Sequence, residues 1–273
     1  LMLQTQKEIS QWRGLDSTTI KFLAAALMFV VHIHQMFYSM GVPHWIDLFG
    51  RPVFPLFLFL AADSFYYTHS KKGYIKRLLF ASWGMTILTF MVQRLVPNDT
   101  IMLANNAFST FFVVAIYMLS WDYIKAGIRK KNKKDIGKAA LFMLLPILFM
   151  LPMVLMSYLI SSGSTSGGLL QTLAFISMLL PNPVSVEGGL LYVLMGILLY
   201  IFRKNRRIQI AVVIVVGAIA YFRFGGVQWA ILLALIPMVL YNGQKGKGFK
   251  NFFYIFYPTH IIALYLLATL LMK

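Results

Sequence analysis

The chain has no cysteine among its 273 residues and only eight acidic side chains. The missing cysteines exclude disulfides, thiolate nucleophiles and cysteine-based metal sites. Charged residues of both signs make up 12% of the sequence, which is about half of their usual share in a soluble domain. The charge that is present is one-sided, because 25 lysines and arginines give a formal net charge of +17.

Apolar residues are abundant, with 59% hydrophobic side chains and a mean hydropathy of +0.74. A globule of 31.1 kDa cannot bury that much apolar surface in water. Since a membrane-spanning helix takes about 20 residues, the chain has room for roughly nine or ten spans and for no long loop. We therefore expect an all-α polytopic membrane protein with a single transmembrane domain over residues 1–273. A soluble catalytic head, a nucleic-acid-binding module and a disordered chain are excluded.

The apolar residues fall into runs that are separated by polar or basic segments. The first run is a full span with no cleavage site after it, so we expect no removable signal peptide. We see no internal repeat. The runs cover residues 20–40, 52–69, 78–95, 105–124, 139–160, 169–180, 188–202, 208–222, 227–241 and 252–272.

Basic clusters between the runs predict the topology. If these clusters are cytoplasmic, as the positive-inside rule predicts, an even number of spans separates neighbouring clusters. Three runs lie between Lys138 and Arg203, so one of them does not cross, and 169–180 is the shortest. We expect about nine spans, or ten if this run also crosses, with a short re-entrant or interfacial helix near 169–187 and a cytoplasmic N-terminus. The clusters are Lys7, Arg13 and Lys21; Lys71, Lys72, Lys76 and Arg77; Lys125 to Lys138; Arg203 to Arg207; and Lys245, Lys247 and Lys250.

Ionisable residues at membrane depth are costly, which makes them candidates for function. His32 follows Lys21 after eleven residues, a rise of about 16 Å and about 20° more than three helical turns. The two side chains therefore share a helix face, with Lys21 near the inner surface and His32 near the middle of the bilayer. His34 points about 200° away from His32. A regular helix cannot direct both rings at one ion, and we expect no metal site.

Asp63, Glu187 and His260 are the other ionisable candidates. Asp63 is predicted at mid-membrane below Arg51, and Glu187 stands in a long stretch without other acids. An acid and a histidine at similar depth on neighbouring helices could pair, with the acid orienting the ring. Structural roles remain open: His32 could bond a backbone carbonyl, Asp63 could pair with a basic side chain, and His260 could support the kink expected at the preceding proline.

Four stretches of sequence carry specific patterns. They are Leu15–Asp16 with Ile20–Ala24, Met28 and His32; Gly50–Phe57 with Asp63–Phe65, Thr68 and Tyr74–Leu78; Asn106–Thr110; and Gln228–Ala230 with Leu235–Pro237, Tyr241–Gly243 and Phe253–His260. Together they resemble the TraX family of membrane proteins. The Gly-Arg-x-x-Phe-Pro string at 50–55 and the Phe-Tyr-x-Phe-Tyr-Pro-x-His string at 253–260 are the most specific, whereas residues 111–220 match mainly by hydropathy.

The resemblance implies an acyltransferase. The family's named member acetylates the amino terminus of F-type pilin, and its first span is similar to acyltransferase family 3, in which a histidine follows an arginine by eleven residues. Lys21 and His32 occupy these two positions. Two departures matter: Val31 stands where the family usually has Asp, and Asp63 stands where it usually has Glu. They make Asp63 the better candidate partner for His32.

The implied protein is an acyl-CoA-dependent transmembrane acyltransferase of the bacterial cytoplasmic membrane. Acetyl-CoA is the expected donor, and the acceptor is an exported protein amine, a glycan or a lipid; no metal and no nucleic acid take part. His32 would be the general base or would carry the acyl group, with Asp63 as its partner. Lys21, Lys76 and Arg77 would contact the CoA phosphates, and the loop at 242–248 also offers amides and charge suited to phosphate. Substrate or structural support is expected from Arg51, which would serve the acceptor side or brace Asp63, and from Asn106, Glu187, Tyr257 and His260.

A proton-coupled transporter or flippase is the alternative from another class. It would use His32, Asp63 and His260 as a proton or substrate path. The lack of a visible repeat, which many transporters have, counts against it. A non-catalytic assembly factor is the third hypothesis.

Overall fold

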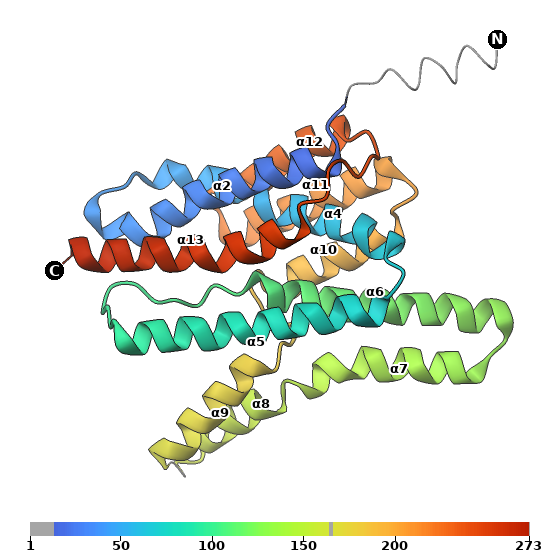
Figure 1. The fold of residues 1–273 in the computed structure, drawn as a ribbon. Coiled ribbons are helices and arrows are strands. Elements are labelled where there is room, and N and C mark those ends of the chain that lie inside the picture. Colours follow the sequence, from blue (N-terminus) through green and yellow to red (C-terminus); the bar gives the residue numbers. More distant parts are fainter. Residues whose placement is uncertain (1–13, 164–165, 273) are drawn as a thin grey trace. The chain divides into compact units, whose positions relative to one another are not determined.

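The computed structural model describes residues 14–163 and 166–272, and every regular element within these ranges is a helix (Figure 1). A single parallel β-bridge joins Leu15 to Tyr241. Lys7 and Arg13 of the first basic cluster lie outside the described residues. The prediction of an all-α membrane protein is confirmed.

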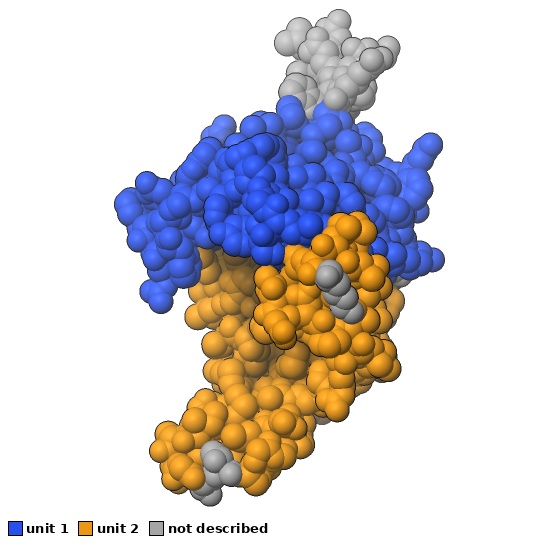
Figure 2. All heavy atoms as spheres, turned by 90° about the vertical axis from the view of Figure 1, so that its left-hand side faces the viewer, with its two compact units in different colours: residues 1–60, 204–264 blue, residues 61–203, 265–273 orange. Residues whose placement is uncertain are grey.

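The chain divides into two compact units, which are coloured separately in Figure 2. The first unit contains residues 1–60 and 204–264, and the second contains residues 61–203 and 265–273. The boundary falls inside two helices, α4 (Val53–Tyr67) and α13 (Lys250–Leu271). Each unit is therefore built from segments that lie far apart in the sequence.

The first unit combines the beginning of the chain with most of its end. Its packing brings α2 against α3 and brings α11 against η3 and α12. In addition to the first part of α4 and most of α13, its elements are α2 (Ser17–Phe37), η1 (Tyr38–Met40), η2 (His44–Ile46), α3 (Asp47–Gly50), α11 (Arg206–Phe224), η3 (Gly226–Ala234) and α12 (Leu235–Leu240).

A glycine allows α3 to approach α2 closely. A Cβ atom on Gly50 would lie 2.6 Å from the Cγ2 atom of Val31, a separation that real side chains do not tolerate. Val31 was noted above as a departure from the pattern that the resemblance implies. Its side chain packs against the glycine of the Gly-Arg-x-x-Phe-Pro string and forms an apolar contact between the two helices.

In the second unit α6 is the central helix. It packs against α5, α7 and α10, and 61% of its apolar window is buried, compared with 11% for Lys133–Ser161. The exposed leucines of α7 and α8, such as Leu141 and Leu155, suit contact with lipid. The elements are the end of α4, α5 (Lys71–Leu95), α6 (Ala107–Lys130), α7 (Lys133–Leu148), α8 (Leu151–Ser161), α9 (Gly167–Leu179), α10 (Gly189–Ile201) and the end of α13.

Short polar side chains determine where the long helices begin. Each accepts a hydrogen bond from a backbone amide in the first turn, which satisfies a donor that the helix leaves without a partner. Such caps matter at the membrane surface, where the chain enters an apolar medium. The cap residues are Asp16 of α2, Ser70 of α5, Asn106 of α6, Asn132 of α7 and Asn205 of α11.

Within the described residues, seven helices are long and apolar enough to cross a membrane. The segment expected to be short, near 169–187, contains the 13-residue helix α9. Two of the nine expected spans, at 188–202 and 227–241, are helices of 13 and 15 residues and fall below the length of the other seven. The seven are Ser17–Met40, His44–Tyr67, Lys71–Leu95, Ala107–Lys130, Lys133–Ser161, Arg206–Phe224 and Asn251–Leu271.

The segment Gly226–Leu240 compensates for its small number of residues by its geometry. Nine of its residues form η3, a 3₁₀-helix, and six form α12. At about 2.0 Å rise per 3₁₀ residue and about 1.5 Å per α residue, the segment reaches about 27 Å. That length is close to the hydrocarbon thickness of about 30 Å.

The contact between Gly50 and Val31 predicts a stability effect. We expect Gly50→Ala to destabilise the protein by about 1–3 kcal/mol, because the new methyl group overpacks the contact of α3 with α2. The measurement is the thermal melting of the purified protein in detergent. Gly84→Ala is the matched control, because no atom lies within 4 Å of a Cβ at Gly84. A lowered melting temperature for the control, or an unchanged one for Gly50→Ala, would contradict the prediction.

Candidate functional site

His32 and His260 form a buried pair that connects α2 to α13. The Nδ1 atom of His32 lies 2.7 Å from the Nε2 atom of His260, and the two rings stack with centroids 4.9 Å apart. Each residue is only 5% exposed. Both belong to the first unit. The partner found for His32 is thus a second histidine from the other end of the chain.

A backbone carbonyl sets the direction of the hydrogen bonds in this pair. The Nδ1 atom of His260 lies 2.6 Å from the carbonyl oxygen of Phe256, one turn earlier in α13. A carbonyl oxygen only accepts, so the Nδ1 of a neutral His260 carries the proton and its Nε2 carries the lone pair. That lone pair accepts from Nδ1–H of His32. In this arrangement the Nε2 atom of His32 carries a lone pair, as a general base or nucleophile requires.

Aromatic rings surround the pair. The Phe256 ring stacks on His260 with centroids 4.5 Å apart, and the Phe29 ring lies 6.0 Å from the same imidazole. The ring of Tyr257, a residue predicted to support the site, lies 6.4 Å from His32. Apolar walls of this kind exclude water, which strengthens polar interactions inside the site.

The basic loop at 242–249 is held against the beginning of α2. The Ser17 amide donates to the Gln244 carbonyl over 2.8 Å, and the Thr18 hydroxyl donates to the Lys245 carbonyl over 3.0 Å. Gly246 has a φ of +69°, and a Cβ atom on it would lie 2.5 Å from a carboxylate oxygen of Asp16, so both the backbone conformation and the close approach favour glycine. The ring of Phe22 continues the contact against the loop and the first turn of α13.

This loop gives α2 and α13 a common starting point. The two helices run side by side in the same direction from it (Figure 1). His32 lies eleven residues after Lys21 in α2 and His260 lies ten residues after Lys250 in α13, rises of about 16 Å and about 15 Å. The positive charges of Lys21, Lys245 and Lys247 therefore lie at one end of this helix pair, and the two histidines lie further along it.

Arg51, which directly follows α3, lies near the end of α2 that is opposite the basic loop. Its guanidinium donates to a carboxylate oxygen of Asp47 over 3.4 Å. The other oxygen of Asp47 lies 2.8 Å from the Nδ1 atom of His34. Asp47 and His34 were not among the residues predicted from the sequence, although Asp47 stands four residues before Arg51, the spacing of an ion pair on a helix.

Three further candidates belong to the second unit. Asp63 is half-buried in α4, whereas Lys76 and Arg77 are exposed in the first two turns of α5. Because His32 belongs to the first unit, the pairing of Asp63 with His32 stays a prediction.

The structure brings Asn106 and Glu187 together in the second unit. A carboxylate oxygen of Glu187 accepts from the backbone N–H of Asn106 over 3.1 Å, and the backbone carbonyl of Glu187 accepts from the Thr110 hydroxyl over 2.8 Å. The side chain of Asn106 also caps α6 and donates to the Ser82 carbonyl and the Thr86 hydroxyl of α5. These two predicted residues therefore fasten the beginning of α6 to α5 and to the loop before α10, which is a structural role.

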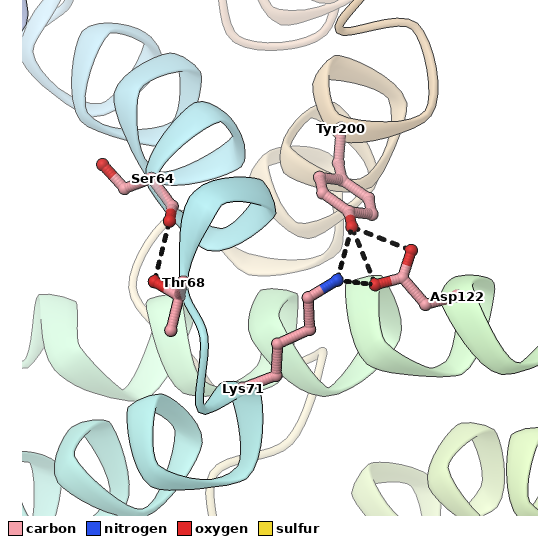
Figure 3. Close-up of polar contacts among 5 residues, drawn as sticks. All are labelled: Ser64, Thr68, Lys71, Asp122 and Tyr200. Atoms are coloured by element: carbon pink, nitrogen blue, oxygen red, sulfur yellow. Dashed lines mark hydrogen bonds and ion pairs between the residues drawn. The ribbon is translucent and has the colours of Figure 1, made fainter. Parts of the chain in front are cut away.

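A second polar cluster near the other end of α6 was missed at the sequence level. Lys71 pairs with Asp122, and the Tyr200 hydroxyl lies 2.8 Å from both carboxylate oxygens of Asp122 (Figure 3). The Arg203 guanidinium lies 3.5 Å from the centre of the Tyr66 ring beside it. The available signal was Asp122 itself, an acid inside the apolar run 105–124. The cluster joins the beginning of α5 and the end of α10 to α6.

The Lys71–Asp122 pair predicts a second stability effect. We expect Asp122→Asn to destabilise the protein by about 1–3 kcal/mol, because the partly buried Lys71 ammonium loses its counter-charge. Asp135→Asn is the matched control, since its partner Lys138 is 53% exposed and such pairs contribute about 0–1 kcal/mol. Melting temperatures in detergent are the measurement. Equal decreases in melting temperature in the two variants would contradict the prediction that the Lys71–Asp122 pair contributes more stability than the exposed pair.

Comparison with known proteins identifies the family. The family model described as TraX protein matches residues 16–268, so the chain belongs to the TraX family. The match includes His32 and His260. No curated protein and no solved structure matches the chain.

Proposed function

We propose that this member of the TraX family is an integral membrane acyltransferase. It moves an acyl group, acetyl by the family default, from a cytosolic CoA thioester to an amine or hydroxyl of an acceptor at the membrane or on its outer side. The observation that carries the proposal is the buried His32–His260 pair, whose hydrogen bonds are directed by the Phe256 carbonyl. We place the protein in the bacterial cytoplasmic membrane with its N-terminus in the cytosol, as the charge clusters predict.

His32 is the group that handles the proton. As the acceptor's lone pair attacks the thioester carbonyl carbon, its N–H or O–H proton passes to the Nε2 atom of His32. The tetrahedral intermediate then collapses, the carbon–sulfur bond breaks, and the CoA thiolate takes the proton from His32. The imidazolium that exists in between is supported by the lone pair of His260, which accepts from Nδ1–H. An acyl-imidazole at the same Nε2 atom is the alternative route.

The basic end of the helix pair supports binding of the CoA phosphates. Lys21, Lys245 and Lys247 gather there through contacts that hold the loop on α2. An extended pantetheine arm that follows the two helices would then bring the thioester about 16 Å further, to the depth of His32. Lys76, Arg77 and Asp63, in the second unit, remain predicted contributors. Tyr257, whose ring centroid lies 6.4 Å from that of His32, would orient the acyl group.

The test is acetyl-CoA turnover by the purified protein in liposomes, with free CoA and a labelled acetyl group both detected. We expect His32→Ala to lower the rate by about 10²–10⁴-fold while acetyl-CoA still binds, because a positioned general base contributes that much. His69→Ala is the matched control, an exposed histidine of the second unit.

His260 is proposed to act by positioning the His32 ring. Variants of His260 therefore distinguish this positioning role from a role in helix packing alone. His260→Gln can keep an acceptor for Nδ1–H of His32 and should retain more activity than His260→Ala. Covalent label on wild type but not on His32→Ala would select the acyl-imidazole route. A wild-type protein that binds no acetyl-CoA would overturn the proposal and favour the transporter.

The basic end of the helix pair, where the CoA phosphates are proposed to bind, gives a separate prediction. We expect the double variant Lys245→Ala/Lys247→Ala to raise KM for acetyl-CoA about tenfold with little change in kcat, because the lost contacts are electrostatic and remote from the thioester. The effect should shrink as the salt concentration rises. Lys133→Ala/Lys134→Ala removes two exposed lysines of another cluster and is the control. A fall in kcat alone would show that the loop does not hold the donor.

A further inference from the structure

A separate polar cluster lies where α2 ends, away from the basic loop. His34 is 5% exposed, and its Nδ1 atom lies 2.8 Å from Asp47. The guanidinium of Arg51 donates to the other oxygen of the same carboxylate. His34 points about 200° away from His32 on the helix, so a ligand held by His34 does not share the site of His32. The whole cluster belongs to the first unit.

Two atoms of this cluster are buried without a hydrogen bond. They are Nε2 of His34 and Nε of Arg51, for which no partner exists among the residues that the structure describes. Buried polar atoms in native proteins nearly always have a partner, and an exception needs an explanation. Both residues contact the carboxylate of Asp47, so one small ligand that entered beside this carboxylate would provide partners for both atoms.

The chemistry of the two atoms defines the ligand. A carboxylate only accepts, so Nδ1 of His34 carries the proton that it donates to Asp47, and Nε2 offers a lone pair that needs a donor. The Nε–H group of Arg51 needs an acceptor. A hydroxyl group is both a donor and an acceptor, and two neighbouring hydroxyls satisfy both atoms. Because Asp47 balances the charge of Arg51, the cluster suits a neutral group better than an anion.

The cluster borders the surface of the protein. The ring of Tyr38 meets His34 edge to face at 5.5 Å and is half exposed. Its hydroxyl is held by a 2.8 Å hydrogen bond with Nε2 of His44. Asp47 keeps 28% of its side chain exposed. An aromatic ring beside paired polar groups suits a polyol, which has both C–H and O–H surfaces.

We propose that His34, Asp47 and Arg51 form a binding site for a neutral polyol group, presented by a sugar or by the glycerol of a lipid headgroup. The site goes beyond the proposed acyl transfer and does not depend on it. Under the predicted topology the site lies on the outer side of the membrane, away from the basic end of the helix pair where the acyl-CoA donor is proposed to bind.

The test is saturation-transfer NMR on the full chain in phosphatidylcholine nanodiscs, which avoids sugar-based detergents. The probes are methyl β-D-glucopyranoside, glycerophosphoglycerol and, as a probe without neighbouring hydroxyls, cyclohexanol. We expect saturable binding of at least one of the first two and none of cyclohexanol. Binding of the glucoside alone identifies a sugar, binding of glycerophosphoglycerol alone identifies a lipid headgroup, and binding of both supports a general polyol site.

Two conservative variants assign the binding to the cluster. His34→Asn keeps a donor near the position of Nδ1 and removes Nε2, and Arg51→Lys keeps the charge and removes Nε–H. Each should weaken binding at least tenfold, whereas His69→Asn should leave it unchanged. If His34→Asn does not fold, as its melting curve would show, Arg51→Lys carries the test. Absence of binding to wild type, or equal binding by wild type and the folded variants, would overturn the proposal.

Discussion

The hydrogen bond between His32 and His260 is the interaction on which the candidate site depends. It joins a residue near the beginning of the chain to one near its end, and it has a direction because the Phe256 carbonyl can only accept. Lipid offers no hydrogen-bond partner, so an imidazole at membrane depth depends on protein groups for its hydrogen bonds. The Phe256 carbonyl therefore fixes, through two rings, which nitrogen of His32 carries a lone pair.

The same helix orients a second histidine by a different means. His32 is oriented by a neutral ring on α13, whereas His34, two residues later, is oriented by the Asp47 carboxylate on α3. Because the two rings leave α2 in nearly opposite directions, α2 presents two separate polar sites in an otherwise apolar unit. The glycine at position 50, against Val31, lets α3 come close enough to supply the carboxylate.

The second unit is organised around α6, which is fastened near both of its ends. At its beginning Asn106 and Glu187 tie it to α5 and to the loop before α10, and at its other end Asp122 binds Lys71 and Tyr200. Helices in a membrane gain little from apolar contact with one another, because lipid is as apolar as leucine. Polar clusters of this kind therefore define which helices are neighbours.

Hydropathy and charge were enough to predict the helical membrane fold, its apolar segments and the short helix near 169–187, because helix formation in lipid is a local requirement of the backbone. The eleven-residue spacing likewise predicted that Lys21 and His32 lie on the same face of one helix. Local sequence could not select His260 as the partner of His32, nor Asp122 as the partner of Tyr200, residues that lie 228 and 78 positions apart. An apolar pattern predicts that a helix enters the membrane. Because all the membrane helices share this pattern, it does not predict which helices are neighbours. The tertiary structure alone decides which polar side chains meet, because these pairings depend on which helices pack together.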